Sequence, residues 1–369
     1  MRIIIFSLIL FLTLPALGQG SYVDFYRNKA KEKMDQGNYA EAINDLYKVQ
    51  EKLPNDPKTL YDIANCYYRM KNYNIAIEKG KAIINRFPNY IDAYRIVGNS
   101  YDISGNYEEG VNTLIEGIEK NPYEGELYLD LGIIEMLRHN YAVALKYWEQ
   151  GIKAEPYLAD NYYWATTIYA KSNQKIWALL YGEHFLNIEK NSDRTVEISK
   201  TLLNTYLNYI KEINGENTPV EINLLINEFQ VNEFEQNFRH VFKIMQGNGL
   251  LNLDAISKSI KGKPTYLRGL GEIRSSMVQL WVQTYQNHTK VPLFDWLAKM
   301  QQAGYLESYS HWLMMSAEPD YFIQWQTKSS VSYSNFLSWY YRNPLKLNVT
   351  SYFSRLNFIR DINESIPQE

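Results

Sequence analysis

Hydrophobic and polar positions recur with a fixed period over residues 23–192. Proline, tyrosine and small residues each return after 34 positions, and three such series are present. The series are Pro54, Pro88, Pro122 and Pro156; Tyr39, Tyr73, Tyr107 and Tyr141; and Ala42, Ala76, Gly110, Ala144 and Ala178. A period of this length is typical of stacked supersecondary units, so a repeat architecture is predicted.

Residues 91–124 show how one unit is built. Their first apolar series has the i, i+3, i+4, i+7 spacing of one helix face, and Gly105 then interrupts it. A second apolar series runs from Tyr107 to Ile118, and Pro122 ends it because proline cannot continue a helix. Each unit is therefore predicted to be a helical hairpin whose outer apolar face is covered by neighbouring hairpins.

These units resemble the tetratricopeptide repeat, a helix–turn–helix unit of the same length. The residues that carry the resemblance are Leu60, Ile63, Ala64, Tyr67, Tyr73, Ala76, Gly80 and Pro88 in one unit and Tyr128, Leu131, Gly132, Tyr141, Ala144, Trp148, Gly151 and Pro156 in another. The last unit matches weakly and has Lys190 in place of the proline. The resemblance implies an all-α solenoid of about five hairpins over residues 19–192. These hairpins are 23–56, 57–90, 91–124, 125–158 and 159–192.

Beyond about residue 193 the period disappears, whereas helical spacing continues. Residues 195–213 place apolar side chains on one helix face. Thr218 followed by Pro219 predicts the start of another helix, with a cap residue before proline at the first turn. Residues 193–369 are therefore predicted to form an irregular, aromatic-rich helical domain, for which no resemblance to a family is found.

Residues 1–18 have the features of a signal peptide. Arg2 precedes an apolar run at 3–14, and small residues follow it, which places the expected cleavage before Gln19. The alternative is a membrane anchor, but a spanning helix needs about 20 apolar residues and this run is shorter. The mature protein is expected to be exported to the periplasm or the extracellular medium.

Charge and composition exclude several classes of function. Lys and Arg number 38 and Asp and Glu number 41, so the net charge of −3 gives no general attraction to nucleic acid. Cys66 is the single cysteine, which excludes an intrachain disulfide and a cysteine metal site. The five histidines are His139, His184, His240, His288 and His311, and no two are spaced as a helical metal pair. Glu183 and His184 are adjacent and are expected to point in different directions, so no metal, cofactor or catalytic residue is predicted.

The resemblance implies that the first helices of the hairpins line a concave groove that binds extended peptides. The corresponding positions are Tyr61, Asn65, Tyr68 and Arg69; Arg95, Asn99 and Asp102; Leu129, Ile133, Met136 and Leu137; and Tyr163 and Trp164. Their side chains are expected to point outward, because they fit neither apolar series of a hairpin. Asn65 and Asn99 occupy the same repeat position, and an amide there suits a peptide backbone because it both donates and accepts hydrogen bonds.

Two observations narrow what this groove binds. Chaperone-binding members of the family hold a terminal carboxylate with a basic clamp. Asp62 and Asp92 stand at two of those clamp positions, so this specificity is excluded. The later part of the groove, residues 129–137, is apolar. It is expected either to bind a foreign helix or strand or to be covered by the second half of the chain.

The predicted function is a non-enzymatic scaffold or assembly factor for protein–protein interaction, with a protein or peptide partner and no nucleic acid. The alternative is a carbohydrate- or cell-wall-binding module that uses exposed aromatic residues of residues 290–345, with Trp325 and Trp339 as the residues to test. An enzyme in the second half is a third class, but no acid–base group of diagnostic spacing supports it. The partner's identity and the oligomeric state stay open.

Overall fold

The computed structural model describes residues 14–213, 215–224, 236, 239, 266–285 and 291–358. Within these ranges the chain is mostly helical and holds no β-strand, only isolated bridges between Ser172 and Ile222 and between Asn348 and Ser351. The all-α fold class predicted from the sequence is thereby confirmed.

Helices α1 to α10 form five successive hairpins in the described part of the chain. Their bounds are α1 (Leu14–Asp35), α2 (Tyr39–Lys52), α3 (Pro57–Arg69), α4 (Tyr73–Arg86), α5 (Ile91–Ile103), α6 (Tyr107–Lys120), α7 (Gly125–Leu137), α8 (Tyr141–Ala154), α9 (Ala159–Ala170) and α10 (Lys175–Ile188). Each hairpin corresponds to one predicted repeat, so the arrangement of about five hairpins is confirmed.

The turns inside the first four hairpins share one backbone conformation. Gly37, Lys71, Gly105 and His139 lie one repeat apart, and their φ angles are 79°, 62°, 85° and 61°. The residue after each of them donates its N–H to a carbonyl five residues earlier, as at the end of a helix closed by a Schellman motif. His139 is therefore a turn residue.

The chain divides into two compact units, Met1–Asp130 and Leu131–Glu369, and the division falls inside α7. The domain boundary expected at residue 192 stays a prediction.

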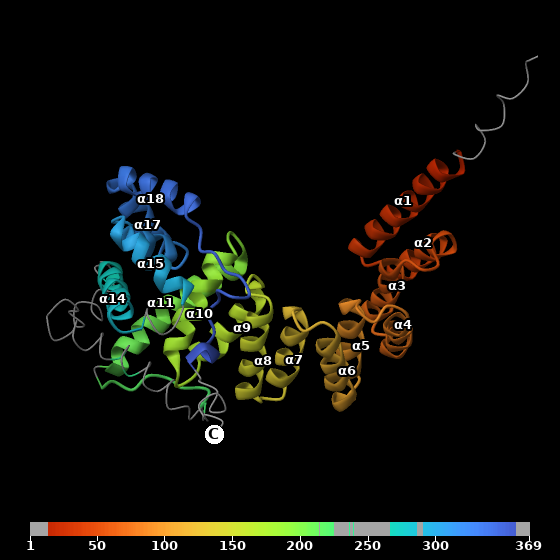
Figure 1. Cartoon of the computed structure of the whole chain (residues 1–369), viewed down its shortest axis with the longest axis horizontal. Coiled ribbons are helices and arrows are strands. Elements are labelled where there is room, and N and C mark those ends of the chain that lie inside the picture. Colours follow the sequence, from red (N-terminus) through yellow and green to blue (C-terminus); the bar gives the residue numbers. More distant parts are fainter. Residues whose placement is uncertain are drawn as a thin grey trace, which may run out of the picture. The chain divides into compact units, whose positions relative to one another are not determined.

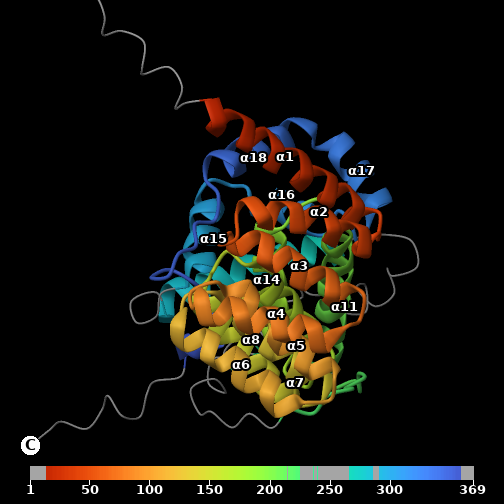
Figure 2. The same cartoon turned by 90° about the vertical axis from the view of Figure 1, so that its right-hand side faces the viewer.

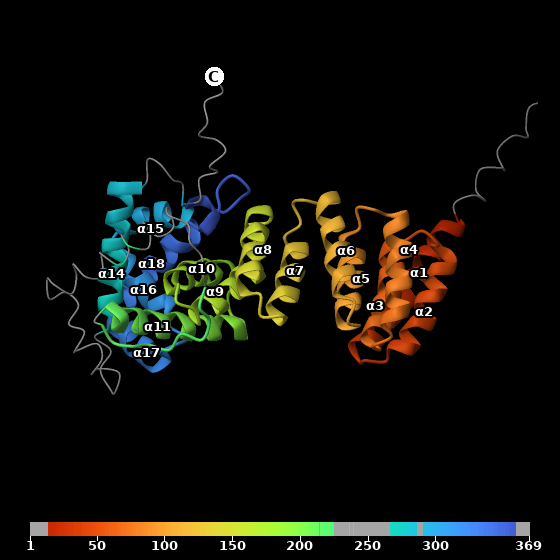
Figure 3. The same ribbon diagram turned by 90° about the horizontal axis from the view of Figure 1, so that it is seen from below.

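In the first unit, consecutive helices pack on one another in chain order from α1 to α6 (Figures 2 and 3). Small residues allow α5 and α6 to come close together. A Cβ atom added to Gly110 would lie 2.8 Å from the carbonyl oxygen of Gly98, which is closer than a side chain tolerates. These two glycines therefore permit the close helix contact, as their positions in the repeat predict.

In the second unit, α9, α10 and α11 pack on one another, and the later helices gather beside α10 and α11 (Figure 1). The additional bounds are α11 (Asp193–Ile213), α14 (Tyr266–Leu280), the π-helix η1 (Trp281–Tyr285), α15 (Pro292–Gln302), α16 (Leu306–Leu313), α17 (Pro319–Lys328), α18 (Ser330–Arg342) and the 3-10 helix η2 (Arg355–Phe358). The helix predicted over residues 195–213 is confirmed as α11.

The helix start predicted at Thr218 and Pro219 is wrong. Residues 216–220 have no helical structure, and the Thr218 hydroxyl donates to Glu212 at the end of α11 instead of capping a helix. The following segment lies along the turn between α9 and α10, where the Ile222 N–H donates to the Lys171 carbonyl over 3.0 Å. A tertiary contact therefore replaces the local helix signal.

Helix α10 is the centre of the second unit, because every residue from Lys175 to Leu186 is buried. Its two buried charges are paired with other helices. Lys175 donates to Glu212 on α11 over 2.7 Å, and Glu183 accepts from Arg274 on α14 over 3.1 Å. A helix that is mostly apolar around its whole circumference is stable only when other elements pack against every side of it.

The segment after α18 covers α8 and α10. Phe353 is fully buried and stacks on Trp177 and His184, with ring centroids 6.2 and 4.9 Å apart. The guanidinium of Arg355 pairs with the carboxylate of Glu149 on α8, and both are buried. The C-terminal end of the described chain is thus part of the core of the second unit.

His184 is expected to make the stability of the second unit depend on pH. Its ring lies between Tyr162 and Phe353, Nδ1 contacts the Leu180 carbonyl, and Nε2 has no hydrogen-bond partner in the described structure. Glu183 meets Arg274 instead, so the two adjacent residues do point apart. Burial lowers the pKa of His184 to about 4, against about 6.5 in an unfolded chain.

Because the folded state excludes a proton that the unfolded state binds, the free energy of unfolding is expected to fall as pH drops from about 6.5 towards 4. His184→Phe is expected to remove this part of the pH dependence, measured by urea unfolding at several pH values. His139→Phe at the exposed turn is the matched control. An unchanged pH profile in His184→Phe would contradict the assignment.

Candidate functional site: the α3–α5 face of the first unit

The predicted groove residues of the first unit lie on α3, α5 and the start of α7. Helices α3 and α5 are the first helices of consecutive hairpins and are in contact. Helical spacing places the predicted positions in one stripe on each helix. We call this surface the α3–α5 face. Its residues are Tyr61, Asn65, Tyr68, Arg69, Arg95, Asn99, Asp102 and Leu129.

Arg95 joins α5 to α7. Its Nε donates to Asp130 over 2.7 Å, its Nη1 donates to Glu126, and Asp92 lies 3.8 Å away. Burial acts to lower the pKa of Arg95, but the carboxylate of Asp130 outweighs it and the pKa is raised. Arg95 is therefore a fixed cation inside a cluster of carboxylates, with its guanidinium already engaged.

Asn99 belongs to the same cluster. Burial raises the pKa of Asp130, while Arg95 and a hydrogen bond from the Asn99 side chain act to lower it. Asn99 thus supports Asp130, which sequence reasoning did not single out. The signal that would have found Asp130 is its place next to Leu129 on α7, at a position that meets the first helix of the preceding hairpin.

Three side chains of the face keep polar groups free for a partner. The amide of Asn65 and the phenol hydroxyls of Tyr61 and Tyr68 have no hydrogen-bond partner in the described residues, and all three side chains are half-buried. Tyr61 stacks on Tyr90 with centroids 5.9 Å apart, and burial raises the pKa of Tyr61 to about 12. These groups are neutral, positioned hydrogen-bonding groups at neutral pH.

Other predicted positions differ in exposure. Arg69 is exposed, and its Nε donates to the hydroxyl of Tyr39 over 3.1 Å. Asp102 is half-buried. Leu129 is only 7% exposed, so it does not point outward as expected, because the hairpin packing encloses it.

Acidic residues outnumber basic residues on and beside this face. Asp62 is mostly enclosed, and burial raises its pKa although Lys58 lies 3.3 Å away. The acidic side chains are Asp62, Asp92, Asp102, Glu126 and Asp130, and the basic ones are Lys58, Arg69 and Arg95. These residues therefore give the face a net negative charge.

The predicted groove residues of the second unit are placed differently. Ile133 and Met136 are half-buried, and Leu137 is 62% exposed. The Tyr163 hydroxyl donates to Glu197 on α11 over 2.9 Å, and Trp164 stacks on Trp148. Within this unit, the chain itself therefore contacts the position of Tyr163.

Helix α11 continues the packing of the repeats although its sequence lacks their apolar pattern. Arg194 donates to Asp160 over 2.7 Å, and each of these polar contacts between α9 and α11 joins residues 34 apart. The sequence signal was the 34-residue step between polar residues of α9 and α11, which the apolar pattern did not reveal. Helix α11 therefore packs on α9 in the position that the first helix of a further hairpin would take.

The aromatic residues named for carbohydrate binding are engaged with neighbours. Trp325 stacks flat on His311, with centroids 4.0 Å apart, and Trp339 contacts Trp296 and Tyr305. Both tryptophans are half-buried. Carbohydrate binding stays a prediction.

In the described part of the chain, no helix has the length and apolar character needed to cross a bilayer. No group of three or more His, Cys, Asp or Glu side chains is placed to hold a metal ion among these residues.

Residues 33–98 match the family described as Tetratricopeptide repeat. This confirms the resemblance, and residues 33–98 carry tetratricopeptide repeats, a fold that suggests a scaffold for protein–protein interaction. No curated protein matches the sequence.

The similar solved structures have low sequence identity to this chain and TM-scores below 0.5. TTC0263, a thermophilic tetratricopeptide repeat protein of Thermus thermophilus, is 21% identical, with a TM-score of 0.41 over 49% of this chain and 99% of that chain. The protein pilF of Pseudomonas aeruginosa is 16% identical, with a TM-score of 0.41 over 54% and 95%. A MamA fragment from Desulfovibrio magneticus is 18% identical, with a TM-score of 0.34 over 46% and 94%.

Proposed function

We propose that the protein is an exported, non-enzymatic scaffold or assembly factor whose α3–α5 face binds a segment of a partner protein. The observation that carries this proposal is the stripe of Tyr61, Asn65 and Tyr68, whose polar groups are half-buried and free of hydrogen bonds within the described chain. The helices that hold these groups pack before any partner arrives, so little ordering entropy is lost on binding.

The charge of the face favours a basic partner segment. Asp62 and Asp92 flank the free amide and phenols, and Arg95 is engaged by Asp130 and Glu126. Lysine or arginine side chains of an extended segment would meet these carboxylates, while its backbone would bond to Asn65. Such binding is expected to weaken as salt is added, because exposed charges are screened.

The proposal is tested by partner capture with matched variants. Partners are captured from the native host, identified by cross-linking mass spectrometry, and their affinity is measured with purified protein. Asn65→Ala combined with Tyr68→Ala is expected to weaken binding about tenfold or more, as loss of central contacts does in other interfaces. Asn85→Ala on the exposed side of α4 is the control and is expected to bind as the parent does.

Circular dichroism establishes that the variants remain folded. Equal affinity of the double variant and the control would refute binding at this face. Asn65→Ala combined with Asn99→Ala would be a less clean test, because Asn99 supports Asp130.

Export is a separate part of the proposal. It rests on the basic, apolar and small-residue order of residues 1–18, and cleavage before Gln19 would remove the first residues of α1, which begins at Leu14. Mass spectrometry of the protein made in its host is expected to find Gln19 as the first residue. A protein that begins at Met1 in the cell extract would contradict export by cleavage.

A further inference from the structure

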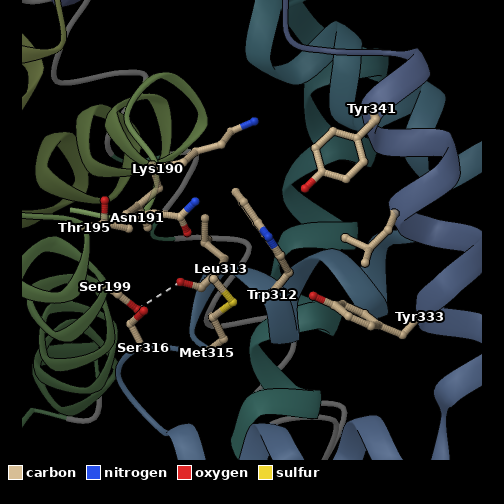
Figure 4. Close-up of a pocket in the computed structure, with 12 residues that line it drawn as sticks. Lys190, Asn191, Thr195, Ser199, Trp312, Leu313, Met315, Ser316, Tyr333 and Tyr341 are labelled. Atoms are coloured by element: carbon tan, nitrogen blue, oxygen red, sulfur yellow. Dashed lines mark hydrogen bonds between the residues drawn. The ribbon is translucent and has the colours of Figure 1, made fainter.

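The second unit contains a small pocket between the end of α10, the start of α11 and helices α16 and α18. Its volume is about 180 Å³. Figure 4 shows Lys190 and Asn191 on one side, Tyr341 and Tyr333 on the other, and Trp312 between them. An apolar cavity of about 150 Å³ accepts benzene in other proteins, so this pocket has room for one ring.

The Lys190 side of the pocket is the place where the repeat pattern breaks. Lys190 stands where the earlier repeats have proline, and Asn191 turns the chain with a φ of 61°. The Lys190 ammonium lies 4.6 Å from the ring centroid of Tyr340 and 5.8 Å from that of Tyr341. Lys190 is an exposed residue, and these two rings place its charge at the rim of the pocket.

Among the described residues, this ammonium has no counter-ion. None of those that line the pocket is a carboxylate, and Lys190 makes no ion pair with any of them. Partial burial lowers the pKa of Lys190, as expected for a cation that has lost some of its water without gaining an anion. A bound anion would compensate that loss.

Further donors face the same space without a partner. The indole N–H of Trp312, the side-chain amide of Asn191 and the hydroxyl of Tyr341 form no hydrogen bonds with the described residues. The rest of the wall is made of apolar side chains and small hydroxyl side chains. The apolar ones are Leu186, Leu313, Met315 and Leu337, and the hydroxyl ones are Thr195, Ser199 and Ser316. The pocket thus combines a surface for an apolar ring with a cation and free N–H and O–H donors.

We propose that this pocket binds a carboxylate attached to a single aromatic ring. The ring lies against Trp312 and Leu337, and the carboxylate accepts hydrogen bonds from Lys190 and Asn191. A neutral sugar fits less well, because its hydroxyl groups need strong acceptors and the wall supplies no carboxylate. This binding goes beyond the scaffold function, and it does not depend on it, because the α3–α5 face belongs to the other unit.

The test uses the full mature chain and isothermal titration calorimetry. Phenylacetate is expected to bind, and neutral phenylacetamide is expected to bind about tenfold or more weakly, because a hydrogen bond to a charged group is stronger than a neutral one. Lys190→Gln is expected to abolish this preference. Lys328→Gln, an exposed lysine of α17 that does not line the pocket, is the control and is expected to keep it.

The ligand could be a free acid or the aromatic C-terminal residue of a protein. The peptide Gly-Gly-Phe with a free carboxyl group distinguishes the two sources. Tighter binding of the peptide than of phenylacetate indicates a chain terminus, and weaker binding indicates a small acid; either supports the pocket.

A second variant keeps the test independent of Lys190. Leu337→Trp fills the cavity and is expected to abolish phenylacetate binding while circular dichroism stays unchanged. The proposal is overturned if phenylacetate fails to bind at millimolar concentration, if phenylacetamide binds equally well, if Leu337→Trp still binds, or if glucuronate binds more tightly than phenylacetate.

Discussion

Replacing Arg355 by alanine is expected to lower the free energy of unfolding of the second unit by about 3–5 kcal/mol. The Arg355 guanidinium contacts both carboxylate oxygens of Glu149, at 3.0 and 2.9 Å, and Glu149 has no exposed surface. The hydroxyls of Tyr169 and Tyr181 also donate to Glu149, over 2.8 and 3.0 Å. Without Arg355, a buried carboxylate would keep these hydrogen bonds but lose its counter-ion.

Urea unfolding followed by circular dichroism measures this effect. Arg342→Ala, at an exposed arginine near the end of α18, is the matched control and is expected to change stability by less than about 0.5 kcal/mol. Glu149→Leu combined with Arg355→Met is expected to be less destabilised than Arg355→Ala, because the charge and its partner leave together. A loss below about 1 kcal/mol in Arg355→Ala would contradict the assigned role of the ion pair.

Gly132→Ala is expected to destabilise the second unit by about 1–3 kcal/mol or more. A Cβ atom at Gly132 would lie 2.1 Å from Nε1 of Trp148 on α8. Trp148 is fully buried and stacks on Trp164, so it cannot swing away to make room. Helix α7 can approach α8 only because this position carries no side chain.

Gly271→Ala on α14 is the matched control. Its Cβ would meet its nearest neighbour, Ser310 Oγ, at an ordinary 3.5 Å. Alanine is also the better helix former by up to about 1 kcal/mol, so this variant is expected to be neutral or more stable in urea unfolding. Equal stability of the two variants would show that the close contact at Trp148 is relaxed in solution.

The repeat part of the fold was predictable because its signals are local and periodic. Gly105 and Pro122 mark the turn and the end of one hairpin, and the same positions mark them in other hairpins. The contact between Gly98 and Gly110 follows from the same pattern. Each repeat packs only on the repeats before and after it, so the order of the repeats in the sequence gives their packing partners.

The second unit was less predictable because its core joins distant residues. Glu149 and Arg355 are 206 positions apart, and nothing in the local pattern of either residue announces the pair. The helix predicted to start at Thr218 is absent for the same reason, because the Thr218 hydroxyl donates to Glu212 instead of capping a helix. Such tertiary contacts outweigh the local propensity of a segment to form a helix.

The candidate site was predictable as a helix face but not as a set of contacts. Spacing placed Asn65 and Asn99 at equivalent positions, yet Asn65 has no hydrogen-bond partner among the described residues and Asn99 bonds to Asp130. The two asparagines differ because α7 places Asp130 next to Asn99. The repeat position of an asparagine does not specify which residue lies opposite it. Leu129 was expected to be exposed and is buried for the same reason.

Binding at the α3–α5 face is tested most directly by site-specific photo-crosslinking in the native host. A benzoylphenylalanine replaces Tyr68 on the face or, as the control, Asn85 on α4. The expected result is a covalent adduct at position 68 with a lysine- or arginine-rich segment of one partner protein, and no such adduct at position 85. No adduct at position 68, or the same adducts at both positions, would contradict binding at this face.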